Sequence, residues 1–137
     1  MTLRLQLQDV HAELLGEIAR LEAATSAAAP DPDLAAIRLR LSRASGRRMR
    51  LIEQQIVPFL LNRATGGEAD SLARLRADMA AARSRSSQHV ARWSLDAAKK
   101  DWPGYCEASA EIRVEMRAQI ERERAVLDPL LRKAEVS

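Results

Sequence analysis

Apolar residues recur along most of the chain at steps of three and four, which is the spacing of an amphipathic helix. This pattern predicts helices over residues 2–24, 34–62, 70–98 and 105–133. No segment alternates convincingly between apolar and polar residues as a half-buried strand does. The predicted inward faces are Leu3, Leu7, Val10, Leu14, Ile18 and Leu21 in the first helix; Leu34, Ile37, Leu41, Met49, Ile52, Ile56 and Leu60 in the second; Leu72, Leu75, Met79, Ala82, Ser86, Val90 and Trp93 in the third; and Ile112, Met116, Gln119, Ile120, Glu123, Leu127, Leu130 and Leu131 in the fourth.

Short breaks separate these four segments. Residues 27–33 contain two prolines, residues 65–67 read Thr-Gly-Gly, and residues 99–104 end in Trp-Pro-Gly. Pro58 lacks a backbone donor, so the second helix is expected to kink or end near Val57. Helices joined by short connections favour antiparallel neighbours. The sequence therefore predicts an all-α chain, a single domain over residues 1–137, folded as an up-down-up-down antiparallel four-helix bundle.

The second and fourth helices end in similar segments. Residues 56–61 read Ile-Val-Pro-Phe-Leu-Leu, and residues 126–131 read Val-Leu-Asp-Pro-Leu-Leu. A glutamate, Glu53 or Glu123, lies upstream of each segment within about two helical turns. The repetition indicates two similar helical hairpins.

Composition narrows the class of protein. The chain has 137 residues, of which 47% are hydrophobic and only 3% aromatic, a profile that favours helix over strand. The single Cys106 excludes an intramolecular disulfide framework and a cysteine-rich metal site, and it fits a reducing compartment. There is no uncharged apolar run long enough to span a membrane and no signal-peptide pattern. A cytoplasmic protein with no membrane association is expected.

The net charge is +3, and arginine outnumbers lysine. Six arginines lie close together, either as a solvated helix face or as a patch for a partner protein with an acidic surface. Nucleic acid is not favoured as a partner, because aromatic stacking platforms and nucleic-acid motifs are absent. The third helix has a thin apolar face, and Trp93 and Trp102 are expected near the surface, so both a monomer and a homodimer stay open. The six arginines are Arg38, Arg40, Arg43, Arg47, Arg48 and Arg50.

Several polar residues fall on or beside the apolar stripes. His11 shares the inward side of the first helix, and Gln119 and Glu123 lie one turn apart on the stripe of the fourth. A carboxylate is rarely buried unless it is paired or binds metal. Glu123 therefore needs a solvated helix end, a metal, or an ion-pair partner among Arg47, Arg48 and His11. Glu53 lies at the edge of the second stripe, and His89 flanks the face that Val90 and Trp93 define.

Together these residues resemble the hemerythrin-like (HHE cation-binding) family over nearly the whole chain. The resemblance rests on the early His11-Ala-Glu-Leu-Leu-Gly-Glu-Ile run, the two glutamate-bearing helices with proline-leucine endings, and the Trp-Pro-Gly-Tyr entry to the last helix. It implies a four-helix bundle whose core holds two iron ions through inward histidines and carboxylates. In the family, the second and fourth helices each carry a His-x-x-x-Glu pair about ten residues before the proline, and such a pair points to one spot.

This chain departs from that ligand set. Counting back from Pro129, the histidine place holds Gln119 and the glutamate place holds Glu123. Counting back from Pro58, the two places hold Arg48 and Ile52, with Glu53 one residue later. His11, Glu53 and Glu123 are thus vestigial metal ligands by resemblance, and Arg48 and Gln119 replace histidines. Arg48 is expected to put a permanent positive charge where the family has iron, with Glu123 as its partner.

The leading prediction is a small cytoplasmic, non-catalytic regulatory or partner-binding module that has lost its di-iron site and has no cofactor. No catalytic set, phosphate loop or zinc motif supports an enzyme. One alternative is a sensor of oxygen, nitric oxide or iron that keeps iron on His11, Glu53 and Glu123. Another is a histidine phosphotransfer bundle with His11 or His89 as acceptor. Cys106 is either a plain small residue or a thiol whose pKa the helix N-terminus lowers.

Overall fold

The computed structural model describes residues 1–136, and within this range it is helical with no strand. The prediction of an all-helical chain is confirmed. The elements are α1 (Leu3–Thr25), α2 (Leu34–Leu51), the π-helical turn η1 (Ile52–Ile56), α3 (Val57–Leu61), α4 (Glu68–Arg92), α5 (Leu95–Lys100) and α6 (Trp102–Glu135).

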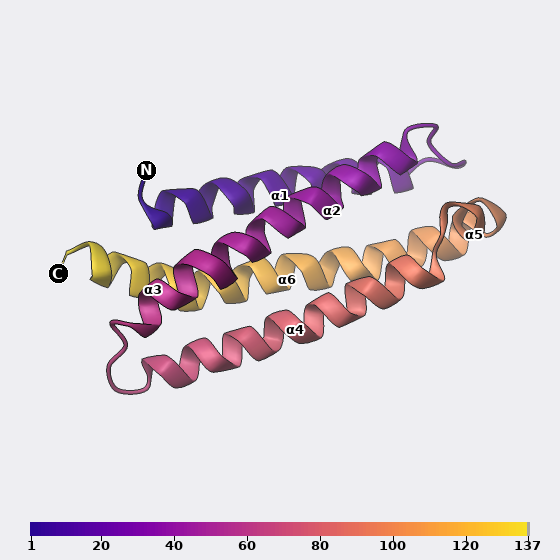
Figure 1. Cartoon of the computed structure of the whole chain (residues 1–137). Helices are drawn as coiled ribbons and strands as arrows, with labels where there is room; N and C mark the ends of the chain where they lie inside the picture. The colour runs from indigo at the N-terminus through magenta and orange to yellow at the C-terminus, as the bar shows by residue number, and fades with distance from the viewer. Residues whose placement is uncertain (137) are drawn as a thin grey trace.

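Four long segments make up the molecule: α1, the continuous run α2–η1–α3, α4, and α6 (Figure 1). Successive segments run in opposite directions, and both chain ends lie at the same end of the molecule (Figure 1). The closest packing is of α1 on α2, α4 on α6, and α1 on α6. The pair α2 and α4 is not among the closely packed ones. None of the described helices is both long and apolar enough to cross a lipid bilayer.

The second predicted helix contains a π turn, η1. The N–H of Val57 donates to the carbonyl oxygen of Ile52, five residues back, and Pro58 lies in the first turn of α3. Proline has no N–H and its ring crowds the carbonyl four residues earlier, so a local widening of the helix accommodates it. The distortion lies where Pro58 predicts it.

The bounds predicted for the third helix, residues 70–98, are wrong at both ends. It begins at Glu68 and stops at Arg92, and after a break at Trp93 a new short helix starts. The break occurs because the Ser94 hydroxyl accepts a hydrogen bond from the N–H of Ala97 at 3.1 Å, which caps the new helix. Val90 is 58% exposed, contrary to the prediction that it faces inward.

The apolar core has two parts. The terminal cluster, near the chain ends, contains Leu7, Leu51, Ile52, Ile56, Val57, Leu60, Leu72, Leu75, Met79, Leu127 and Leu131. The distal cluster contains Leu14, Ile18, Leu21, Ala24, Leu34, Ile37, Leu41, Ala44, Trp93, Ala98, Trp102, Tyr105 and Ile120. The two proline-leucine endings therefore meet in one cluster, the terminal one.

Both tryptophans are buried in the distal cluster, so the prediction that they lie near the surface is wrong. The indole N–H of Trp102 donates to the carbonyl oxygen of Ala27 at 2.9 Å, which lets the polar edge of the ring enter the core. Trp93 packs edge-on against the ring of Tyr105. The stripe of the third predicted helix places Trp93 inward, and its burial agrees with that stripe although α4 ends one residue before it.

Candidate functional site

Four polar side chains lie buried where the two apolar clusters meet. Along α1, His11 separates Leu7 of the terminal cluster from Leu14 of the distal cluster. Arg48 on α2 and Glu123 on α6 occupy equivalent places on their helices. The exposed fractions are 1% for His11, 6% for Arg48, 1% for Gln119 and 0% for Glu123. We call these four residues the polar cluster.

Glu123 is the centre of the polar cluster, and both of its carboxylate oxygens have partners. Oε1 lies 2.8 Å from Nε2 of His11 and 3.2 Å from Nε of Arg48. Oε2 accepts a hydrogen bond from the side-chain amide of Gln119 at 3.1 Å. A buried carboxylate is costly unless it is paired and hydrogen-bonded. Here His11 and Gln119 supply the hydrogen bonds, and Arg48 supplies the opposite charge without a hydrogen bond of its own.

A second arginine extends the network toward the surface. The Gln119 side-chain oxygen accepts from Nη2 and Nε of Arg122 at 2.8 Å and 3.1 Å. This contact orients the Gln119 amide so that its NH₂ group faces Glu123. Nδ1 of His11 is buried and has no hydrogen-bond partner within residues 1–136. The Nε2 contact with a carboxylate requires a proton on Nε2, so Nδ1 carries the lone pair in the neutral imidazole.

The structure brings together most, but not all, of the residues singled out in the sequence. Of the three predicted ion-pair partners of Glu123, His11 and Arg48 contact it, whereas Arg47 pairs with Glu13 on the surface. Glu53 is exposed and does not join the polar cluster. It lies in the π turn, where burial of Ile52 and Ile56 turns it to the outside. The expectation that Glu53 is part of the site is therefore wrong.

The polar cluster does not fit the di-iron centre that the family resemblance implies. It offers one carboxylate and one imidazole, and the guanidinium of Arg48 approaches the oxygen that His11 also contacts. Iron in such proteins needs several imidazoles and carboxylates to complete its coordination and offset its charge. Among the described residues, no three His, Cys, Asp or Glu side chains gather as a metal-binding group.

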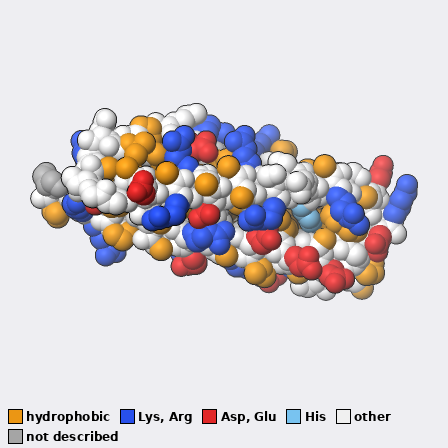
Figure 2. Space-filling view, turned by 90° about the horizontal axis from the view of Figure 1, so that it is seen from below, with side chains coloured by type: hydrophobic (Ala, Val, Ile, Leu, Met, Phe, Trp, Pro, Cys, Tyr) orange, Lys and Arg blue, Asp and Glu red, His pale blue; other side chains and the backbone are white. Residues whose placement is uncertain are grey.

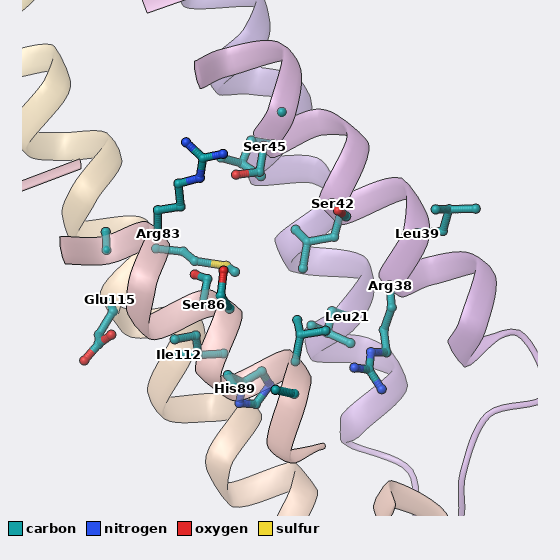
Figure 3. Close-up of a pocket in the computed structure, with 18 of the residues that line it drawn as sticks. Leu21, Arg38, Leu39, Ser42, Ser45, Arg83, Ser86, His89, Ile112 and Glu115 are labelled. Carbon is teal, nitrogen blue, oxygen red and sulfur yellow. The ribbon is translucent and has the colours of Figure 1, made fainter. Parts of the chain in front are cut away.

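A cleft of about 820 Å³ opens beside the polar cluster, between α2 and α4. Figure 3 shows Ser42 and Ser45 on one side and Ser86 on the other, with Arg83 extending from α4. Both helices present small residues here, so they cannot fill the space between them. Leu14 and Leu21 of α1 also line the cleft, as do Tyr105, Ile112 and Met116 of α6. Arg48 and Gln119 link this lining to the polar cluster.

His89 lies at the other end of the cleft from Arg83 (Figure 3) and is not part of the polar cluster. Its ring stacks on Tyr105 with the centroids 6.1 Å apart. Burial, and then the nearby charge of Arg38, lowers the pKa of His89 below its usual value. The same burial effect raises the pKa of Tyr105.

Cys106 is a partly buried thiol with no activated character. Burial raises its pKa, and the neighbouring charge of Arg113 only partly opposes that shift. The alternative of a thiol whose pKa is lowered by the helix N-terminus is therefore wrong. A low-pKa thiolate is the reactive form of cysteine, so this residue lacks the character of a nucleophile.

Sequence reasoning missed a second buried arginine. The Nη1 group of Arg113 donates to the hydroxyls of Ser109 at 2.7 Å and Thr25 at 2.9 Å. The four-residue spacing of Ser109 and Arg113 on α6 was the available signal, but the contact with α1 depends on the fold. The cleft was missed for the same reason, because small residues on two helices reveal a space only once the helices face each other.

The arginine-rich stretch does not form one uniform basic patch. Arg40 pairs with Glu17, Arg47 with Glu13, and Arg48 is buried in the polar cluster. Figure 2 shows one face of the molecule, on which basic and acidic side chains are interspersed. Three of the six arginines are thus paired with carboxylates of the chain itself, and one of these three is buried.

No family model, curated protein or solved structure matches the chain. The hemerythrin-like resemblance therefore rests on the residues quoted above.

Proposed function

We propose that this chain is a cytoplasmic, non-catalytic binding module, built as an up-down-up-down four-helix bundle of hemerythrin-like type. In this proposal the Arg48 guanidinium replaces the metal charge at the centre of the bundle. The bundle then serves as a regulatory or partner-binding scaffold that needs no cofactor. The small side chains that face each other across α2 and α4 supply the binding surface.

The surroundings of the Glu123 carboxylate are the observation that carries this proposal. One oxygen contacts His11 and forms an ion pair with Arg48, and the other accepts a hydrogen bond from Gln119, so a cation takes up the position beside this carboxylate that a metal ion would need. Arginine stays protonated at any physiological pH, so its positive charge is permanent. A divalent cation placed beside it would meet repulsion and too few ligands.

The two alternative functions draw less support from the geometry. An iron sensor with reduced ligation needs Glu53, which is exposed and outside the polar cluster. A phosphotransfer domain needs an accessible histidine, but His11 is 1% exposed and bonded to Glu123. His89 is half-buried against Tyr105 and lacks a following lysine.

The test is elemental analysis of purified protein expressed with added iron and zinc. We expect far less than one equivalent of either metal per chain, and a thermal unfolding midpoint that a chelator does not change. A metal that stabilises the fold would raise the midpoint by mass action, and the chelator would lower it again. Stoichiometric iron or zinc, or a chelator-sensitive midpoint, would overturn the proposal.

A matched variant makes the metal test sharper. The double substitution Arg48→His, Gln119→His restores nitrogen ligands at both substituted places while Glu123 stays. We expect this variant to bind more zinc or iron than the unaltered chain, as a shift in midpoint on metal addition. Equal metal binding by the two proteins would contradict the idea that Arg48 and Gln119 abolished the site.

A further inference from the structure

We propose that the cleft between α2 and α4 binds a small amphiphilic carboxylate, such as a medium- or long-chain fatty acid. The acid group is received by Arg48 and Arg83 at one end, and the apolar chain lies along the floor of the cleft. This inference deepens the proposed function and rests on it in one respect. Arg48 must be a fixed part of the core with no metal ion bound beside it.

Arg48 has unused hydrogen-bond donors that face this space. Its Nε is buried 3.2 Å from Oε1 of Glu123 and forms an ion pair with it, without a hydrogen bond. Within residues 1–136 its two terminal nitrogens make no hydrogen bond either, and unlike Nε they are not fully buried. Because Arg48 lines the cleft, these donors are available to an anion that enters it.

Arg83 adds a second positive charge at the same end. It extends from α4 toward Ser45 on the opposite wall, one turn before Arg48 on α2 (Figure 3). The acidic residue of the lining, Glu115, is already paired with Arg85 at 2.9 Å. The lining therefore carries an excess of positive charge, which favours a carboxylate over a neutral or cationic head group.

The floor of the cleft is apolar. Leu14 and Leu21 come from α1, Leu41 from α2, and Ile112 and Met116 from α6. Along α2 the lining runs from Ala35 to Met49, a distance of roughly 20 Å at the helical rise. Arg38 lines the opposite end, near His89, so basic groups stand at both ends of this apolar floor (Figure 3). The elongated shape fits a chain-like acid whose carboxylate meets Arg48 and Arg83, and the volume is within the usual range for small-molecule sites.

The position of Arg48 also argues for a small ligand and against a helix of a partner protein. Its side chain is only 7% exposed and lies at the base of the cleft. A slender terminal carboxylate can reach such a group, whereas the width of an α-helix, about 10 Å with its side chains, keeps its own acidic residues near the rim. The ligand class is therefore set by the depth of the arginine as well as by its charge.

Isothermal titration calorimetry with dodecanoate, below its micelle concentration, tests the proposal directly. We expect saturable binding at one ligand per chain, at least tenfold weaker binding of dodecanol, and none of dodecyltrimethylammonium. The variant Arg83→Gln should weaken dodecanoate binding by about tenfold, whereas Arg76→Gln, on the exposed face of the same helix and outside the cleft, should not change it.

Two further variants separate loss of the site from loss of the fold. Ser86→Phe places a ring inside the cleft and should abolish dodecanoate binding while the far-ultraviolet circular dichroism spectrum stays unchanged. Arg48→Lys keeps a charge but loses the rigid fork, and should weaken binding more than Arg76→Gln does.

Absence of dodecanoate binding, equal binding of dodecanol, or unchanged affinity in Ser86→Phe would each overturn the inference. Metal content is measured on the same preparations. If the protein is metal-free and does not bind dodecanoate, the proposed ligand is refuted and the proposed function is not. If the protein carries stoichiometric metal, the proposed function is refuted.

Discussion

Replacing Arg48 with methionine is the most direct test of the polar cluster. The change removes a guanidinium that is 6% exposed and lies 3.2 Å from a fully buried carboxylate. Breaking a buried ion pair from one side costs about 3–5 kcal/mol, since the remaining charge is left in a poor solvent. Glu123 keeps its contacts with His11 and Gln119, so we expect the lower end of that range, about 3 kcal/mol.

Urea unfolding followed by circular dichroism measures this loss. For a domain of this size, about 3 kcal/mol corresponds to a fall in the thermal midpoint of about 12 °C. The matched control is Arg43→Met, an exposed position on the same helix, which should change the unfolding free energy by no more than about 0.5 kcal/mol.

A double variant distinguishes the lost ion pair from lost packing. In Arg48→Met combined with Glu123→Gln, the unpaired charge is gone, so this protein should be more stable than Arg48→Met alone. The reasoning would be refuted if Arg48→Met cost no more than Arg43→Met. It would also be refuted if the two core substitutions were simply additive.

Four other outcomes follow from the described contacts. Because the folded pKa of His89 lies below its unfolded value, stability should fall as the pH drops below 6.5, and His89→Phe should reduce that slope in urea unfolding between about pH 7.5 and about pH 5.5. Trp102→Phe, which removes the hydrogen bond to Ala27, should lower the unfolding free energy by about 1–2 kcal/mol in the same assay. Glu53→Ala should change it by less than about 0.5 kcal/mol, unlike Glu123→Ala. Cys106 should react with iodoacetamide more slowly than a cysteine in a short peptide, followed by mass spectrometry, because burial raises its pKa.

Helix content and most inward faces followed from the sequence. Amphipathic periodicity is a local property, so Leu7, Leu14 and Ile18 could be assigned to a buried face without knowledge of the rest of the chain. The distortion before Pro58 was also predictable, since it depends on the chemistry of one residue. The break at Trp93 was not, because an ordinary helical stripe continues through that position and the Ser94 cap starts a new helix there.

The candidate site, too, was partly predictable from the sequence and partly decided by the tertiary structure. The sequence alone indicated that Glu123 needs a solvated helix end, a metal or an ion-pair partner, and it offered three candidates for the ion pair. Only the tertiary structure decided that His11, 112 positions away, and Arg48 reach Glu123 while Arg47 and Glu53 turn outward. The reason is physical: residue spacing sets which face of a helix a side chain occupies, but the packing of α1, α2 and α6 determines which faces meet. The cleft likewise exists only because two runs of small side chains were placed opposite each other.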